Sequence, residues 1–147
     1  MFNGRTALSL DAKGRIAIPT RFREKLSVSC AGRLVLTQHP WDRCLALYPE
    51  PRWNEIAQQV AGLSDANKQA RSLKRRFLGQ AVDLEMDSSG RILVPTELRE
   101  LIGLDKKAML VGLVSRFELW AEDAWDAEQA RMDEDDTMPD SFTSLAF

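Results

Sequence analysis

The sequence offers few of the residues that support metal-based or redox chemistry. Its 147 residues include two cysteines, Cys30 and Cys44, and one histidine, His39. The two cysteines match no paired-ligand zinc spacing, and a single histidine cannot complete a four-ligand set with them. We therefore expect two reduced, partly buried thiols, and neither a metal nor another cofactor. His39 precedes a proline in a loop-like stretch, which is typical of a structural or solvent-exposed histidine.

Long apolar runs and a secretory leader are also missing. No run of about 18 apolar residues occurs, so we expect no membrane-spanning segment and no membrane partner. Residues 1–6 lack the apolar core and the small-residue cleavage site of a signal peptide. These absences favour a cytoplasmic protein. The hydrophobic fraction of 44% is sufficient for one ordinary domain, or for two very small units that share a core.

The sequence also lacks a recognisable catalytic constellation. Asp11 and Asp87 could pair as two carboxylates, but each is followed four residues later by an arginine that would keep it ionised. Ser88 and Ser89 have no accompanying histidine, and no glycine-rich phosphate loop is present. We therefore predict that the protein is not an enzyme and has no small-molecule substrate.

The net charge of −2 conceals a strong segregation of charge along the chain. Residues 122–147 contain nine acidic residues and one basic residue, whereas residues 1–121 contain 19 basic and 13 acidic residues. The bias is strongest in residues 1–33, where seven basic residues face two acidic ones. A basic body with an acidic tail is typical of a protein with an anionic partner, and the alternative is a merely soluble surface.

The most informative feature is a sequence that occurs twice. The stretch DAKGRIAIPTRFREKL begins at Asp11, and DSSGRILVPTELRELI begins at Asp87. Eight of the sixteen aligned positions are identical: Asp11, Gly14, Arg15, Ile16, Pro19, Thr20, Arg23 and Glu24 match Asp87, Gly90, Arg91, Ile92, Pro95, Thr96, Arg99 and Glu100. The similarity resumes where LALYPEPRW, from Leu45, matches FELWAEDAW, from Phe117. The chain is therefore an internal duplication of a unit of about 50 residues.

Each copy predicts the same order of elements. Alternating apolar residues indicate strands, which in the first copy we place at 7–10, 15–18, 34–37 and 44–48. Asp11 and Gly14 are typical of a hairpin turn between the first two strands. A short helix capped by Thr20 follows the second strand. The second copy repeats this order, with strands at 82–86, 91–94, 109–113 and 117–120 and a helix from Thr96 to Ile102.

The duplication divides the chain into four parts. These are repeat 1 at 5–52, a helical linker at 53–78, repeat 2 at 81–124, and an acidic tail at 126–147 that we expect to be mobile. The linker predicts two helices, the second capped by Ser64 or Asp65. This second helix is basic, which indicates a solvated face, an oligomer contact or additional phosphate contacts.

A single β-β-α-β-β unit of this size buries too little apolar surface to fold alone. Two copies related by a local two-fold axis, with their strands interleaved, would complete one shared core. We therefore predict an α+β, mainly β fold, in which the two repeats form one β-barrel with pseudo-two-fold symmetry and helices link them.

The repeated Asp-x-x-Gly-Arg motif has two interpretations. It could be an ordinary hairpin turn whose Asp and Arg form a weak surface ion pair. Alternatively, its arginine could hold a phosphate or a guanine through two hydrogen bonds. Basic residues favour DNA contact by the first copy, namely Lys13, Arg15, Arg21, Arg23 and, on the preceding segment, Arg5. The second copy retains Arg91 but has Ser89 in place of Lys13, so we expect the first repeat to make most of the contact.

The duplicated motif, each copy followed by a proline and a short helix, together with FELW at the end of the second repeat, resembles the bacterial MraZ family of the SpoVT-AbrB superfamily. The resemblance covers residues 1–125. It implies a swapped-hairpin, double-split β-barrel and a ring-like homo-oligomer. It also implies a nucleoid-associated transcriptional regulator, commonly a repressor, that binds short direct repeats in double-stranded DNA upstream of the division and cell-wall gene cluster containing its own gene.

The resemblance assigns the motif residues one by one. They are Asp11, Gly14 and Arg15 in the first repeat, and Asp87, Gly90 and Arg91 in the second. Lys13 fits the DNA-facing loop, whereas Ser89 departs from this basic character, which leaves subunit packing as the alternative role of the second repeat. AbrB-like barrels also occur in antitoxins, so the alternative function is a protein-interaction module. In that case a partner protein would bind the acidic tail, which contains Met138, Phe142, Leu145 and Phe147.

Overall fold

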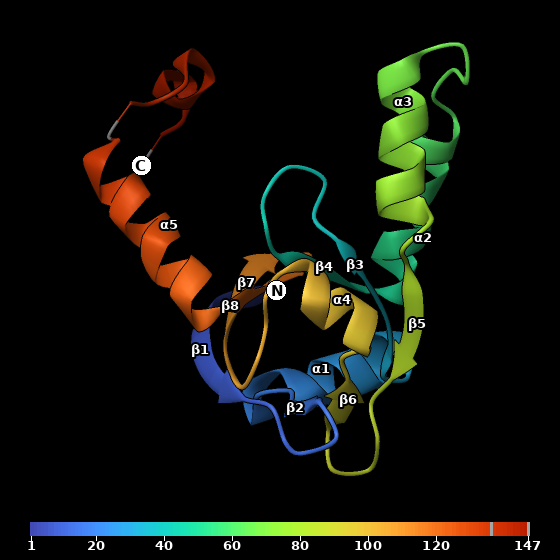
Figure 1. Cartoon of the computed structure of the whole chain (residues 1–147), viewed down its shortest axis with the longest axis vertical. Helices are drawn as coiled ribbons and strands as arrows, with labels where there is room; N and C mark the ends of the chain where they lie inside the picture. The colour runs from blue at the N-terminus through green and yellow to red at the C-terminus, as the bar shows by residue number, and fades with distance from the viewer. Residues whose placement is uncertain (136, 147) are drawn as a thin grey trace.

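The computed structural model describes residues 1–135 and 137–146 (Figure 1). Asp136 and Phe147, both in the predicted tail, lie outside the described residues. The strands are β1 (Phe2–Ser9), β2 (Arg15–Ala17), β3 (Arg33–Gln38), β4 (Leu45–Pro49), β5 (Val82–Glu85), β6 (Arg91–Leu93), β7 (Lys107–Val114) and β8 (Phe117–Ala121). The helices are α1 (Thr20–Cys30), α2 (Glu50–Ala61), α3 (Lys68–Leu73), α4 (Thr96–Leu101) and α5 (Glu122–Glu134), with a π-helical turn at Lys74–Leu78 and a 3-10 turn at Asp140–Ser144.

The strands of the two repeats are interleaved in one six-stranded antiparallel sheet. Its order is β1-β7-β8-β4-β3-β5, so the first strand of each repeat pairs with the third strand of the other. The last strands of the two repeats, β4 and β8, pair with each other at the centre. This exchange relates the two halves of the sheet by the pseudo-two-fold symmetry that the duplication predicted.

Hydrogen bonding leaves this sheet open. Among the described residues, β1 and β5 each pair with one strand of the sheet and form its two edges. The prediction of a fold that combines helices with β-strands is confirmed, and the strands pair in antiparallel fashion. The sheet itself is not closed, and the swapped-hairpin double-split barrel stays a prediction.

The second strands of the two repeats form a separate antiparallel ribbon, β2–β6. Ile16 pairs with Ile92 at its centre, and both side chains are buried. Because side chains alternate along a strand, the neighbouring residues Arg15 and Arg91 lie on the outer face of the ribbon. The ribbon thus covers the core on one side and presents arginines on the other.

One hydrophobic core is shared by both repeats. Helix α1 contributes Phe22, Leu26 and Cys30, which lie on one face because they are spaced four residues apart. Phe22 packs with Phe2 of β1 and Phe117 of β8, with ring centroids 5.7 and 5.3 Å away, and Phe2 and Phe117 lie 4.7 Å apart. These contacts join elements of both repeats, so neither repeat has a complete core by itself.

A proline immediately precedes the helix that follows each motif. Pro19 and Pro95 occupy the cap positions of α1 and α4, and no side chain caps either helix. Thr20 and Thr96 are the first helical residues, so the prediction that they act as caps was wrong. The fixed φ of proline and its missing N–H suit the position just before the first helical turn, which places each threonine inside the helix.

The linker forms a helical arm on one side of the molecule (Figure 1). Here α3 runs alongside α2, and Phe77 anchors the pair through ring contacts with Tyr48 and Trp53. The cap of α3 is Asn67, whose side chain accepts the backbone N–H of Ala70 at 3.0 Å. The predicted caps, Ser64 and Asp65, lie in the preceding loop instead.

A second arm, α5, leaves the opposite side of the molecule (Figure 1). Its first turns pack on the body through Trp125, which contacts Trp120 of β8. The segment that the sequence predicted as a tail from residue 126 therefore begins inside a helix. Within the described ranges, no helix combines the length and apolar character needed to cross a membrane.

Candidate nucleic-acid interface

A tight turn joins β1 to β2 and holds Asp11 beside Arg15. Asp11 Oδ1 accepts hydrogen bonds from the backbone N–H groups of Lys13 and Arg15, each at 2.9 Å. The other oxygen, Oδ2, accepts one from Arg15 Nε at 2.7 Å. Gly14 has a φ of 86°, a left-handed conformation that glycine adopts readily. A single carboxylate thus fixes both the turn and the arginine.

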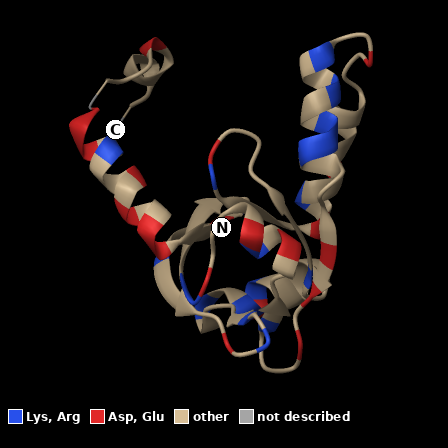
Figure 2. Cartoon of the chain, viewed as in Figure 1, with Lys and Arg blue, Asp and Glu red and all other residues tan. Residues whose placement is uncertain are grey.

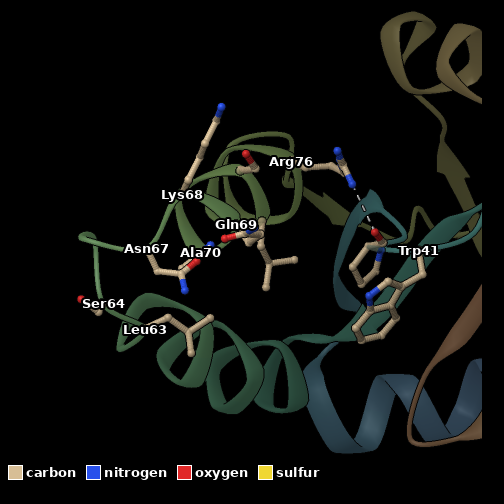
Figure 3. Close-up of a pocket in the computed structure, with 11 residues that line it drawn as sticks. Trp41, Leu63, Ser64, Asn67, Lys68, Gln69, Ala70 and Arg76 are labelled. Atoms are coloured by element: carbon tan, nitrogen blue, oxygen red, sulfur yellow. Dashed lines mark hydrogen bonds between the residues drawn. The ribbon is translucent and has the colours of Figure 1, made fainter.

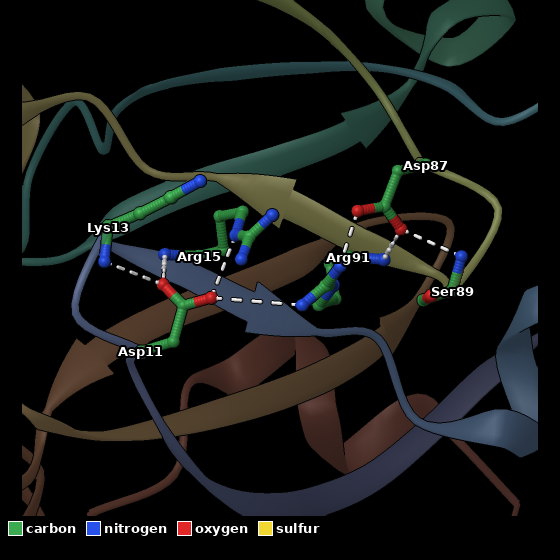
Figure 4. A network of polar contacts seen from close by, with 6 residues as sticks. All are labelled: Asp11, Lys13, Arg15, Asp87, Ser89 and Arg91. Carbon is green, nitrogen blue, oxygen red and sulfur yellow. Dashed lines mark hydrogen bonds and ion pairs between the residues drawn. The ribbon is translucent and has the colours of Figure 1, made fainter.

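The second repeat forms the same turn (Figure 4). Asp87 Oδ1 accepts the backbone N–H groups of Ser89 and Arg91 at 2.9 Å, and Oδ2 accepts Arg91 Nε at 3.2 Å. Gly90 has a φ of 73°. The motif is therefore a tight turn with an internal ion pair in both copies. The predicted hairpin was wrong, because the strands on either side of each turn pair with strands of the other repeat and not with each other.

The two turns meet across the β2–β6 ribbon. The carbonyl groups of Gly14 and Gly90 each accept a backbone hydrogen bond from the other repeat, at 3.0 and 2.8 Å. Arg91 Nη1 also lies 4.0 Å from Asp11 Oδ2, so ion pairing crosses from one repeat to the other (Figure 4). The two copies of the motif consequently form one continuous site.

Each motif glycine is covered by an arginine from the other repeat. A Cβ atom added to Gly14 would lie 2.9 Å from Arg99 Cζ, and one added to Gly90 would overlap Arg23 Nε. Both arginines are held in place because their Nε donates to a backbone carbonyl of their own repeat, at 2.6 Å for Arg23 and 3.0 Å for Arg99. The positive φ therefore favours glycine at both turns, and a side chain at either position would displace the arginine that covers it.

The motif carboxylates remain ionised at neutral pH. The pKa of Asp11 lies below its ordinary value, chiefly because the backbone N–H of Arg15 donates to it, and the pKa of Asp87 is lowered in the same way by Arg91. The side chains of Arg15 and Arg91 are nevertheless 28% and 37% exposed. Among the described residues, the two terminal nitrogens of Arg15 have no hydrogen-bond partner. They are therefore available to an external anion.

Two of the other predicted contact residues lie at the ribbon. Lys13 is exposed in the first turn (Figure 4). Arg23 is half-buried against Gly90, so its guanidinium supports the second turn as well as adding charge. Sequence reasoning did not place Arg99 at the site, although it aligns with Arg23. The acidic neighbours Glu97 and Glu100 masked it in a count of local charge.

Arg21 and Arg5 lie farther from the motif turns. Arg21 is exposed on α1, where its Nη2 donates to Thr6 Oγ1 at 2.8 Å and its guanidinium lies over the ring of Phe22. The guanidinium of Arg5, on β1, lies 6.0 Å from the ring centre of Trp125 in α5. The structure therefore groups Lys13, Arg15 and Arg23 with the second motif, and places Arg5 beside α5. Most of the Lys and Arg residues in residues 1–33 lie on α1 or at the first motif turn (Figure 2).

A second polar cluster joins His39, Cys44 and Glu118, whose potential metal-ligating atoms lie within 4.8 Å of one another. His39 Nδ1 accepts the backbone N–H groups of Trp41 and Asp42, which requires the ring proton to be on Nε2. Nε2 in turn lies 3.2 Å from Glu118 Oε2. A protonated ring nitrogen cannot bind a metal, so the cluster fits a hydrogen-bonded support for the loop at 39–44 better than a metal site.

The thiol of Cys44 belongs to the same buried environment. Burial, followed by the negative charge of Glu118, raises the pKa of Cys44 far above its ordinary value. Both cysteines are free and buried, in agreement with the predicted reduced thiols. The thiol of Cys44 therefore stays protonated and is a poor ligand and a poor nucleophile.

Comparison with known proteins finds the same two repeats that the structure shows. A family model described as "MraZ protein, putative antitoxin-like" matches the chain twice, over residues 1–76 and 77–144, which reproduces the internal duplication. The chain belongs to the MraZ family. A protein of Alcanivorax borkumensis that is named transcriptional regulator MraZ is 51% identical to it. The match spans the full length of both chains.

Two further MraZ relatives match almost the whole chain. The proteins of Saccharophagus degradans and Pseudomonas aeruginosa are 46% and 45% identical, over 99% of this chain and of each relative. Both are named transcriptional regulator MraZ. These names describe a regulator and not an enzyme, which agrees with the prediction from the sequence.

Proposed function

We propose that this chain is a sequence-specific DNA-binding transcriptional regulator. It acts as a repressor in the cytoplasm, at the nucleoid, by binding short direct repeats upstream of the division and cell-wall gene cluster that contains its own gene. The observation that carries the proposal is the β2–β6 ribbon, which presents Arg15 and Arg91 side by side with Lys13 at its edge. A two-stranded ribbon is one of the two elements that the major groove of B-DNA admits.

The arginines of the ribbon are suited to reading bases. Arg15 is oriented by Asp11 through Nε, which leaves its terminal nitrogens to donate to guanine O6 and N7 or to a phosphate. Lys13 adds a phosphate contact at the turn, and Arg21 and Arg23 add positive charge along α1. Arg5 would contribute only where the DNA reaches β1. Asp11 and Asp87 act through the arginines that they hold.

Repeated operator sites imply several copies of the protein. In the proposed ring-like homo-oligomer, each subunit presents its ribbon outward, and neighbouring subunits contact successive repeats. Binding several linked sites at once raises the overall affinity by about 10²–10⁴ over that of one subunit. The pairing of β1 with β7 and of β3 with β5 supports the swapped-hairpin, double-split barrel as the scaffold of each subunit.

The test measures binding to a fluorescent duplex from the region upstream of the gene, by anisotropy over a range of salt concentrations. The logarithm of the binding constant should fall with the logarithm of salt concentration, with a slope of about −0.9 per phosphate contact. Arg15→Ala should weaken binding by about 1–3 kcal/mol and make the slope shallower. Arg131→Ala is the matched control, because it removes an arginine that also pairs with a carboxylate, Glu128, but lies on α5. Absence of wild-type binding, even at low salt, would refute the proposal.

The two ribbon arginines should not contribute equally. Arg91 lies near two carboxylates, Asp87 and Asp11, and has Ser89 beside it in place of a lysine. We therefore expect Arg91→Ala to weaken binding less than Arg15→Ala. Equal losses would show that both repeats contact the DNA alike.

A protein-interaction module is the second candidate function. The acidic tail exposes Met138 and Leu145, which suits an antitoxin-like contact with a partner protein. This alternative predicts no dependence of DNA binding on Arg15, and the same titration therefore separates the two candidates.

A further inference from the structure

A groove runs between the helical arm and the loop at 39–44, at the end of the molecule opposite the ribbon (Figure 1). Its volume is about 780 Å³. Trp41 lies at one wall and Leu63 at the other, with Lys68 and Arg76 above them (Figure 3). The groove thus combines an apolar floor with a positively charged rim.

Trp41 is exposed in a way that is unusual for such a large side chain. Its exposed fraction is 85%, although hydrogen bonds hold the backbone of the loop that carries it. Buried His39 accepts the backbone N–H groups of Trp41 and Asp42, and Arg76 donates to the carbonyl of Pro40. A tryptophan on a fixed loop loses little conformational freedom on binding, which is the property of an interface anchor.

The rim of the groove carries positive charge. Residues 66–80 contain five basic residues and no acidic ones. Lys74 is already paired with Asp65 at 2.6 Å, whereas Lys68 and Arg76 line the groove. An acidic segment with apolar side chains is therefore the occupant that this groove fits.

The C-terminal segment of this chain has that composition. Residues 132–147 contain five acidic residues and no basic ones. Met138 and Leu145 are 61% and 56% exposed, which gives the segment two apolar side chains for the floor of the groove. Asp140 lies between these two residues in the sequence and adds an acidic group to the same stretch.

We propose that the C-terminal segment of one copy binds the Trp41 groove of a second copy. The segment cannot reach the groove of its own chain in the observed arrangement, because α5 and the α2–α3 arm leave the body on opposite sides (Figures 1 and 2). A contact between two different surfaces is head-to-tail and closes into a ring when the rotation between copies permits. This inference rests on the proposed homo-oligomer and names the contact that links its subunits.

The test uses two full-length variants with substitutions at exposed residues only. The groove variant is Trp41→Ala, and the tail variant carries Met138→Asp together with Leu145→Asp. In sedimentation velocity, each variant alone should dissociate, with a dissociation constant raised about 30-fold or more over that of the wild type. Val28→Ala, which truncates an 82% exposed apolar residue on α1, is the matched control and should assemble like the wild type.

Mixing the two variants gives the decisive result. The tail variant retains an intact groove and the groove variant retains an intact tail, so the mixture should form pairs of one chain each and nothing larger. Dissociated variants that fail to pair would overturn the inference, as would variants that assemble like the wild type. A wild-type chain that sediments as a monomer at all concentrations would overturn the proposed ring as well. Binding of each variant to a duplex with a single repeat reports separately on the ribbon and should be unchanged.

Discussion

Asp11 lies between two arginines that belong to different repeats, with its Oδ2 at 2.7 Å from Arg15 Nε and 4.0 Å from Arg91 Nη1. Asp87 contacts Arg91 alone among the described basic residues. Asp11 therefore holds Arg15 directly and also attracts Arg91, whose Nε is held by Asp87 at 3.2 Å. It also means that the two copies of the motif differ in more than the exchange of Lys13 for Ser89.

Asp11→Asn should reduce the specificity of DNA binding more than its strength. The amide oxygen can still accept the backbone N–H groups of Lys13 and Arg15, so the turn is retained. Arg15 then loses its charged partner, whereas Arg91 keeps its pair with Asp87 and loses only the weaker attraction of Asp11. Discrimination between the operator and a scrambled duplex should fall by about tenfold, the order of one misplaced base contact. Asp87→Asn is the matched control and should have the smaller effect. A variant whose operator and scrambled affinities change by the same factor would contradict the orienting role of Asp11.

Much of this site could be predicted from the duplicated sequence. The identities between the copies located Asp11, Gly14 and Arg15 and their second-repeat counterparts, because turn chemistry depends on local sequence. The contacts of Arg23 with Gly90 and of Arg99 with Gly14 could not be predicted, since they depend on the exchange of strands between repeats. Each arginine is distant in sequence from the glycine that it covers.

The contacts and elements that the repeat does not duplicate were the hardest to predict from the sequence. The duplication places no histidine opposite His39, so nothing in the repeat pattern indicated its contact with Glu118. The helical part of the predicted tail was missed for a different reason. Glu122 and Asp123 were counted as acidic tail composition, whereas in the first turn of α5 they interact favourably with the helix dipole.

Gly90→Ala should destabilise the protein, and removing the arginine that covers Gly90 should reverse part of the loss. The left-handed φ costs a residue with a Cβ about 1–2 kcal/mol, and contact with Arg23 adds to this. In urea unfolding, the Gly90→Ala, Arg23→Ala double variant should therefore lose less stability than the sum of the single variants, with a coupling of about 0.5–3 kcal/mol. Gly62→Ala is the control: its φ of −76° is accessible to alanine and its nearest atom is 3.4 Å away. Additive losses would contradict the contact between the repeats.

The motif turns should lose stability only at acidic pH. The pKa values of Asp11 and Asp87 are lowered in the folded protein, so their contribution to stability is present above the unfolded pKa of about 3.9 and is lost as the pH falls through the folded pKa. The difference in unfolding free energy between the wild type and the Asp11→Asn, Asp87→Asn variant should be constant from pH 7 to about pH 5 and shrink below that. NMR titration of the two carboxyl groups provides the direct check. A pKa at or above 3.9 for either would contradict the hydrogen bonding described for the turns.

The support under Trp41 should depend on one nitrogen of His39 and not on a metal. His39→Asn places an amide oxygen near the position of Nδ1, so it can still accept the N–H groups of Trp41 and Asp42. His39→Gln instead places its amide near Nε2, where it can contact Glu118 but leaves those two groups unpaired. We therefore expect His39→Gln to lose about 1–3 kcal/mol more stability than His39→Asn. His39→Gln should also weaken the proposed contact at the groove, because the loop that carries Trp41 is then less firmly held. Zinc should not raise the melting temperature of the wild type, because Nε2 carries the ring proton. A clear stabilisation by zinc that disappears in Cys44→Ser would show that the cluster binds metal after all.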